Sequence, residues 1–395
     1  MKCILMNQNT EVLVVDYDEG IKGFRDILEI KNIDYAPLIV KKAYEKKENI
    51  RLILNNWFKG RGIPTFRDQL DLLLSRLSLS TPEELLDKAF ALSLSDQYWI
   101  KPENRNIQYE DINFFDHDFD SVDFLDASFS NTSKEYVSED ALKTPNNTTD
   151  GMLKKSWIIE NHKRYLLKGG YKNEILQPFN EVLASWICER LGFNHVTYSL
   201  DIINEKVVSK CECFIQKDTE FIPAHQIMYG EEKTHSIQDY EEYIRILESH
   251  GIEKAREKLE NMYILDFLIM NEDRHLNNFG VIRNVHTLEW LDVAPIFDNG
   301  QSFNVISYSN EDLAILGEGR FFYTMKKFED MIKVVHDIQR IDVSKLDGIV
   351  EEFDDLLHQY QAITHLSDDR IHKLCILLNR QIQHLTHFQT SKLER

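Results

Sequence analysis

Two short polar segments, one on each side of a predicted hairpin, constrain the fold of this chain more than any other feature of its sequence. The first segment, residues 271–280, follows an apolar run that is typical of a buried helix. The second segment, residues 295–300, follows two strand-like runs, 281–283 and 288–291, which predict a hairpin. Either segment alone would be common in a turn. Both segments in this order, around one short hairpin, are more specific.

The side chains of these two segments suit phosphoryl transfer. This reaction needs a carboxylate that faces the acceptor hydroxyl and oxygen ligands for the magnesium ion that bridges the phosphates. Asp273 and, five residues later, Asn278 lie in the first segment, and Asp298 begins an Asp-x-Gly in the second. The spacing from Asp273 to Asn278 is that of the protein-kinase catalytic loop. These three residues therefore form the candidate catalytic and metal-binding set.

A site of this kind also needs a lysine on a strand and a glutamate on the helix that follows. Lys168 ends the strand-like run 164–168, and Glu181 lies on the helix predicted for residues 178–191. The apolar side chains of that helix form one arc, and small residues surround Glu181 on the opposite side. The alternative is that Lys168 and Glu181 are ordinary solvated side chains. Because Lys168 and Glu181 occur together with the Asp273 motif, we favour the interpretation that both belong to the site.

The order of predicted elements indicates an α+β chain with an N-terminal region of mixed character. Strands and helices alternate in the first hundred residues, and an acidic stretch with a Pro- and Asn-rich end follows. We therefore predict a mixed N-terminal region at 1–140, a small β-rich lobe at 141–220 and a large helical lobe at 221–395. Helices are predicted at 237–249, 252–270, 344–360 and 367–387. A cleft between two such lobes commonly holds a nucleotide.

Composition excludes several classes of protein. The net charge of -20 repels phosphate backbones, so we expect no direct binding of nucleic acid. The most apolar run, residues 262–270, contains Asp266 and is far shorter than the ~20 residues of a membrane span, so we expect no membrane partner. The five cysteines form no CxxC pair, which favours the reducing cytoplasm.

At these residues the sequence resembles the HipA-like serine/threonine kinases, a bacterial family usually tied to toxin–antitoxin systems, with a fold similar to that of phosphoinositide-type kinases. Residues 273–279 look like the family's catalytic loop, Asn180 and Glu181 like the start of its lobe-bridging helix, and 166–168 like its ATP-lysine strand. The resemblance covers roughly residues 148–305. Residues 1–140 do not match the family's usual N-terminal subdomain. The resemblance implies a two-lobed kinase-like fold.

The resemblance also implies a role for each candidate residue. Lys168 would hold the α- and β-phosphates of ATP, and Glu181 would orient Lys168. Asp273 would be the catalytic base, and Asn278 and Asp298 would ligate Mg²⁺. The hinge strand that meets adenine would comprise Glu212, Cys213 and Phe214.

The family's phosphate loop corresponds to residues 148–155, where this chain departs from the usual pattern. The loop has Gly151 but lacks the family's Gln, and either Lys154 or Lys155 could supply the basic group. Glycine suits a place where the backbone approaches a phosphate closely. Related kinases can phosphorylate a loop serine here and so switch themselves off. Thr148 and Thr149 are the corresponding candidates, and the alternative is that both threonines only cap a turn.

The resemblance implies an ATP- and Mg²⁺-dependent kinase that phosphorylates Ser or Thr of an unidentified protein substrate, with an antitoxin-like partner. Two alternatives remain open at this stage. One is a small-molecule or lipid kinase that uses the same cleft. The other is a pseudokinase, a nucleotide-binding scaffold without transfer; the intact Asp273, Asn278 and Asp298 argue against it.

Overall fold

The computed structural model describes most of the chain as two compact units, each assembled from segments that are not contiguous in sequence. We call them unit 1 and unit 2 and describe each by itself. Unit 1 comprises Met1–Lys168, Glu212–Glu231 and Val281–Asp292, and unit 2 comprises Gly169–Cys211, Glu232–Gly280 and Val293–Arg395. The described residues are 1–65, 70–76, 79, 81–119, 129, 143–149, 153–170, 175–303 and 317–393.

Unit 1 begins with an antiparallel sheet in the strand order β3-β2-β1-β4. Successive side chains of a strand point to opposite faces, and both faces of β1 are buried. Cys3 and Leu5 pack in one hydrophobic cluster, to which helices α1 and α2 contribute, while Ile4 and Met6 pack in a second. The elements are β1 (Lys2–Asn7), β2 (Thr10–Asp18), β3 (Gly23–Ile30), β4 (Tyr98–Pro102), α1 (Leu38–Glu45) and α2 (Ile50–Lys59).

The second cluster joins the N-terminal sheet to the strands around residue 160. Trp157 and Ile159 of β5 (Lys155–Glu160) pack against this cluster. Buried hydrogen bonds of Arg283 make a further connection within unit 1. Arg283, on β10 (Gly280–Asn284), donates to Glu220 of β9 (Thr219–Pro223) at 2.8 Å and to the Tyr98 hydroxyl at 3.2 Å. The described N-terminal residues therefore share one core with later strands.

The remaining elements of unit 1 are short. The hairpins predicted near 156–168 and 281–291 are confirmed, and Lys155 pairs with Lys168 across β5 and β6. Strands β9, β10 and β11 form a small separate sheet. The elements are α3 (Leu70–Arg76), α4 (Pro82–Lys88), β5 (Lys155–Glu160), β6 (Lys163–Lys168), β9 (Thr219–Pro223), α7 (Ala224–Ile227), β10 (Gly280–Asn284) and β11 (Trp290–Val293).

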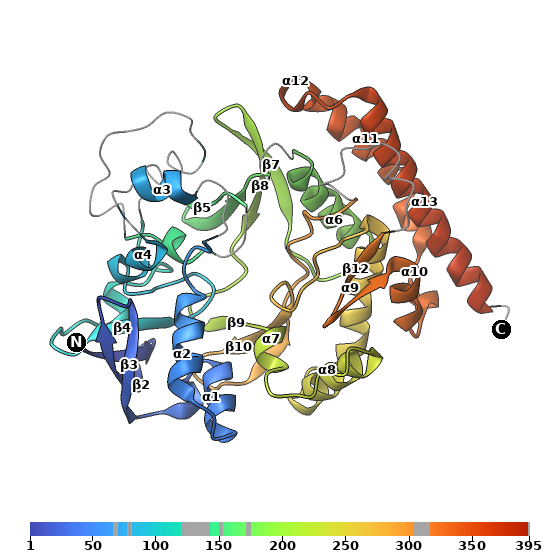
Figure 1. Ribbon diagram of the computed structural model, residues 1–395. Helices are drawn as coiled ribbons and strands as arrows, with labels where there is room; N and C mark the ends of the chain where they lie inside the picture. The colour runs from blue at the N-terminus through green and yellow to red at the C-terminus, as the bar shows by residue number, and fades with distance from the viewer. Residues whose placement is uncertain are drawn as a thin grey trace. The chain divides into compact units, whose positions relative to one another are not determined.

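Unit 2 is mainly helical and is built around α9 and α6. Helix α9 contacts α6, α8 and α13, and α6 also contacts α11 (Figure 1). Both α6 and α9 bury residues all round, which explains why α6 carries small side chains opposite its apolar arc. The elements are α6 (Gln177–Leu191), β7 (Tyr198–Ile203), β8 (Lys206–Glu212), α8 (Ile237–Ser249), α9 (Ala255–Ile269), β12 (Glu318–Phe321), β13 (Thr324–Lys327), α10 (Phe328–Met331), α11 (Ile349–Gln359), α12 (Gln361–Thr364) and α13 (Asp368–Leu393).

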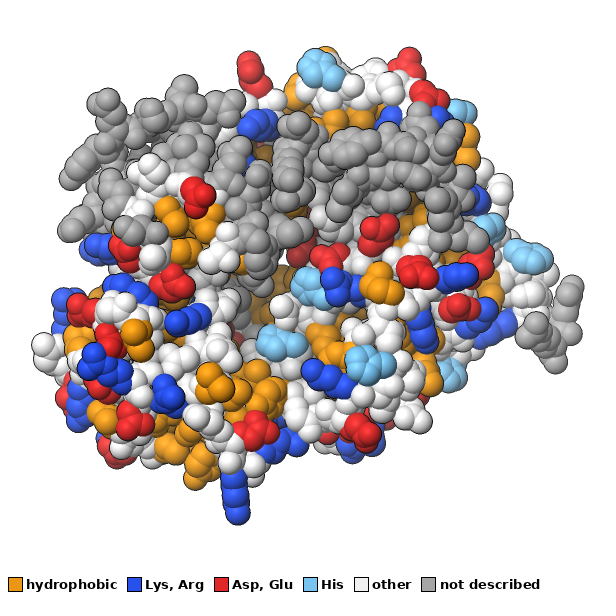
Figure 2. Space-filling view, viewed as in Figure 1, with side chains coloured by type: hydrophobic (Ala, Val, Ile, Leu, Met, Phe, Trp, Pro, Cys, Tyr) orange, Lys and Arg blue, Asp and Glu red, His pale blue; other side chains and the backbone are white. Residues whose placement is uncertain are grey.

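The observed elements confirm the α+β class, since separate antiparallel sheets and helices make up the described chain. No helix in the described ranges combines the length and the apolar character that crossing a membrane requires. On the face drawn in Figure 2, basic and acidic side chains are interspersed.

Candidate active site

A buried ion pair anchors the first polar segment to helix α9. The Arg274 guanidinium is fully buried and donates through Nε to both carboxylate oxygens of Asp266, at 3.2 and 3.1 Å, and through Nη2 to Oδ1 at 2.8 Å. Burial alone would lower the pKa of Arg274, but the negative charge of Asp266, followed by those of Asp298 and Glu181, raises it above its usual value. Arg274 therefore stays charged inside the protein.

The same guanidinium bonds both polar segments. Its Nη1 donates to the carbonyl oxygens of Asn278, at 3.1 Å, and Phe297, at 2.6 Å. Its Nη2 also donates to the side chain of Asn299 at 2.5 Å. Phe297 and Asn299 flank Asp298, so one side chain fixes the end of the first loop and both neighbours of Asp298.

Asp273 lies on this scaffold with its carboxylate accessible. Its backbone N–H donates to the side chain of Asn271 at 3.1 Å, and its side chain is 34% exposed. The Asn278 side chain closes the loop, because its Nδ2 donates to the Asp273 carbonyl oxygen at 3.0 Å. Burial, together with the charge of Asp273, raises the pKa of the neighbouring Glu272. The loop thus presents a half-exposed carboxylate from a rigid backbone.

Asp298 has a left-handed backbone conformation, with φ of 57°. Aspartate is one of the few residues that adopt it readily, because its short polar side chain can bond locally. The residues that follow are bonded to the first loop, since the Glu272 N–H donates to the Gln301 carbonyl oxygen at 2.9 Å. The structure therefore joins, within unit 2, the two motifs that lie on either side of the hairpin in the sequence.

The first turns of α6 hold the Asp298 loop. Glu181 accepts a hydrogen bond from the Asn299 N–H at 2.8 Å. Asn180 donates from Nδ2 to the carbonyl oxygens of Gly300, at 2.9 Å, and Ser302, at 3.0 Å. Glu181 was predicted to orient Lys168, which lies buried in unit 1. Within unit 2, the observed role of Glu181 is to position the backbone beside Asp298.

The donor set formed by Asn278 and Asp298 fits Mg²⁺. Magnesium prefers hard oxygen ligands and is usually bound through one or two carboxylates together with phosphates and water. Asn278 uses its Nδ2 within the loop, and its Oδ1 has no hydrogen-bond partner in the described part of the chain. No group of three or more His, Cys, Asp or Glu residues there could hold a metal ion, so a closed zinc site has no support among those residues.

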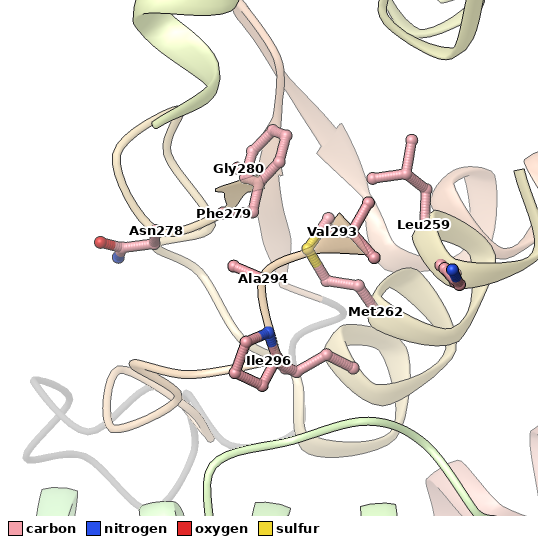
Figure 3. A pocket seen from close by; sticks show the side chains of 10 residues that line it. Leu259, Met262, Asn278, Phe279, Gly280, Val293, Ala294 and Ile296 are labelled. Carbon is pink, nitrogen blue, oxygen red and sulfur yellow. The ribbon is translucent and has the colours of Figure 1, made fainter. Parts of the chain in front are cut away.

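An apolar pocket packs the end of the first loop against α9. Its volume is about 20 Å³, enough for one water molecule and far too small for a nucleotide. Figure 3 shows the Asn278 amide pointing away from the apolar side chains of this pocket. The pocket thus supports the loop rather than binding substrate. It is lined by Lys258, Leu259, Met262, Asn278, Phe279, Gly280, Val293, Ala294, Pro295 and Ile296.

The predicted hinge residues lie in unit 1, where Glu212 ends β8 and Cys213 and Phe214 follow it. The Glu212 side chain pairs with Lys163 at 2.8 Å on the surface. The Cys213 N–H donates to the Arg164 carbonyl oxygen at 2.8 Å, so this N–H is already engaged within unit 1. Phe214 packs edge-to-face on Phe221.

The predicted phosphate loop is described only in part. Gly151 lies outside the described residues, and Lys154 is half-buried. Thr148 ends a short 3-10 helix, and its hydroxyl donates to the carbonyl oxygens of Leu92 and Pro145. Thr149 is buried, and its hydroxyl donates to the Asn146 carbonyl oxygen at 2.9 Å. Both threonines are engaged in local structure.

Sequence reasoning missed the two residues that assemble the site. Asp266 was noted only as a charge within an apolar run, and Arg274 only as part of a motif. A carboxylate inside an otherwise apolar helix needs a buried partner, and this need was the available signal. Arg320, which donates from Nε to the Asp273 carboxylate at 3.0 Å, had no signal in the sequence.

Comparisons with known proteins give structural likeness without a sequence match. No family model and no curated protein matches the chain. The Helicobacter pylori proinflammatory kinase CtkA is similar over 61% of this chain and 95% of its own, at 18% identity and a TM-score of 0.46. HipA of Shewanella oneidensis MR-1, solved with HipB and operator DNA, is similar over 98% of this chain and 97% of its own, at 12% identity and a TM-score of 0.48. These likenesses concern the fold, and the functional argument rests on the side chains of the site.

Proposed function

We propose that this protein is an ATP- and Mg²⁺-dependent protein kinase that phosphorylates serine or threonine, with its catalytic residues in unit 2. The observation that carries the proposal is the buried Arg274, which bonds Asn278, Phe297 and Asn299 and so holds the loop of Asp273 and the loop of Asp298 on one support. A general base and two oxygen ligands held on one rigid support are the parts that phosphoryl transfer requires.

In the proposed reaction, Asp273 accepts the proton of the acceptor hydroxyl. The hydroxyl oxygen forms a bond to the γ-phosphorus, the bond from that phosphorus to the bridging β,γ-oxygen breaks, and ADP leaves. Magnesium held by Asn278 and Asp298 would neutralise charge on the phosphates. Glu181 and Asn180 keep the Asp298 loop in place through the hydrogen bonds to Asn299, Gly300 and Ser302.

The family resemblance assigns further nucleotide-binding roles to residues of unit 1. Lys168 and Lys154 would bind phosphates, and backbone groups of Glu212, Cys213 and Phe214 would read the edge of adenine. The family resemblance of the sequence adds an unidentified protein substrate and an antitoxin-like partner to this proposal.

We expect Asp298→Ala to weaken ATP binding about tenfold at low Mg²⁺ and to lose much of this defect at high Mg²⁺. Removing one charged ligand lowers the affinity for the metal, and mass action restores occupancy as its concentration rises. Calorimetric titration of ATP at two Mg²⁺ concentrations measures both effects. Asp337→Ala, which changes an exposed carboxylate of the same unit, is the control. Equal affinities for Asp298→Ala and wild type at both concentrations would contradict the role.

We also propose that the kinase phosphorylates Thr148 or Thr149 and so inhibits itself. A phosphate adds roughly -1.5 to -2 charges beside the proposed phosphate loop and would repel ATP. The hydroxyls of both residues are bonded to carbonyl oxygens, and Thr148 is the more exposed, so we expect modification mainly at Thr148. Mass spectrometry after incubation with Mg-ATP locates the phosphate. The absence of phosphate from both threonines, or wild-type ATP affinity in Thr148→Asp and Thr149→Asp, would refute this regulation.

A further inference from the structure

The hairpin of β12 and β13 presents a charged face beside the catalytic loop. In its register Glu318 pairs with Lys327 and Arg320 with Met325, and all four side chains are exposed. The alternate residues Gly319 and Phe321 are buried. The hairpin therefore has one face turned to the core of unit 2 and one turned to solvent.

Strand β12 is fixed against the catalytic loop by its backbone. The Arg320 N–H donates to the Glu272 carbonyl oxygen at 3.3 Å. At Gly319 a Cβ atom would lie only 2.9 Å from the Asn271 carbonyl oxygen and 2.7 Å from the Phe328 ring, so only glycine permits this approach. The position of Arg320 next to Asp273 thus follows from the packing of the strand and not from its side chain alone.

The Arg320 guanidinium is held at one end and open at the other. Its Nε donates to the Asp273 carboxylate at 3.0 Å, and the side chain is 52% exposed. Neither Nη group has a hydrogen-bond partner in the described part of the chain. Four N–H donors in a rigid planar fork are therefore presented beside the proposed general base. This geometry matches two oxygens of a phosphoryl group.

Building on the proposed function, we propose that Arg320 is a further catalytic residue, whose Nη groups bind the γ-phosphoryl group during transfer. The acceptor oxygen must lie between Asp273 and the γ-phosphorus as it attacks. A guanidinium bonded to Asp273 therefore lies next to the equatorial phosphoryl oxygens, on which charge is spread in the transition state. The acceptor proton still passes to Asp273, and ADP is still the leaving group, so Arg320 contributes charge and hydrogen bonds only.

The alternative is an ordinary surface ion pair, which contributes little to stability or function. The two interpretations differ in what Arg320→Ala changes. If Arg320 forms only a surface ion pair, Arg320→Ala leaves every step of the reaction unchanged. If Arg320 binds the phosphoryl group, Arg320→Ala mainly weakens binding of the transition state.

The test compares wild type with Arg320→Ala and Arg320→Lys, using Lys327→Ala on the same exposed face as the control. Calorimetry measures the affinity for a non-hydrolysable ATP analogue and for Mg-ADP with aluminium fluoride, which imitates the phosphoryl group in transfer. For Arg320→Ala we expect an affinity for the ATP analogue within about twofold of wild type and at least about tenfold weaker binding of the aluminium fluoride complex. We also expect kcat to fall on the order of a hundredfold or more.

Two further readouts sharpen the result. Free guanidinium should restore part of the activity of Arg320→Ala, and Arg320→Lys should recover little, because an ammonium cannot bond Asp273 and two phosphoryl oxygens together. Arg320→Ala that binds both complexes like wild type and transfers phosphate at the wild-type rate would overturn the inference while leaving the proposed function intact. Wild type that binds neither complex would overturn the proposed function itself.

Discussion

Asp273→Asn is expected to lower the rate of γ-phosphoryl transfer on the order of a thousandfold or more and to leave the affinity for Mg-ATP within about threefold of wild type. The substitution keeps the volume of the side chain and removes the group that accepts the acceptor proton. The loop itself should persist, since its bonds to Asn271 and Asn278 use the backbone of residue 273. Transfer rates from labelled ATP and calorimetric affinities measure the two quantities.

Asp330→Asn is the matched control for this experiment. Asp330 is an exposed carboxylate of unit 2 that pairs with Lys333 in the next helical turn. We expect the Asp330→Asn variant to transfer the γ-phosphoryl group at the wild-type rate. Transfer by Asp273→Asn at a rate within a few fold of wild type would show that another group takes the proton.

Arg274→Ala is expected to lower the free energy of unfolding of unit 2 by about 3–5 kcal/mol. The substitution leaves the Asp266 carboxylate buried without its main partner, and it removes the bonds to Asn278, Phe297 and Asn299. An uncompensated buried charge is among the few causes of so large an effect. Urea denaturation, followed by a probe in unit 2, measures the change.

Arg245→Ala shows what the loss of an exposed arginine costs in the same unit. Arg245 is 67% exposed and pairs with Glu242 one turn away on α8. We expect a loss below about 0.5 kcal/mol. A loss below about 1 kcal/mol for Arg274→Ala would contradict the role of Arg274 as the support of the site.

Local patterns in the sequence predicted much of the fold. Helix α8 was predicted at residues 237–249, which are its observed ends, and in the structure a Ser236–Asp239 capping box fixes its start. The hairpin of β5 and β6 was predicted from its turn and its β-branched and aromatic residues. The two-sided burial of α6 was not predicted, because periodicity in one helix does not report how many neighbours surround it.

The candidate site was predicted as a set of residues but not as an assembly. Asp273 and Asn278 are close in sequence, and their spacing within one loop fixes their relation. Arg320 is 47 residues from Asp273, and only the packing of Gly319 brings it there. Contacts between residues so far apart depend on tertiary structure, which no local pattern encodes.

The central claim is that this site transfers the γ-phosphoryl group of Mg-ATP, and a single-turnover experiment on the wild-type protein tests it most directly. Protein in excess over γ-labelled ATP is incubated with Mg²⁺ or with EDTA, and the label is followed from ATP to protein. We expect label to leave ATP and reach protein serine or threonine only with Mg²⁺. Mg-ATP that binds and keeps its label throughout would identify a nucleotide-binding scaffold and contradict the claim.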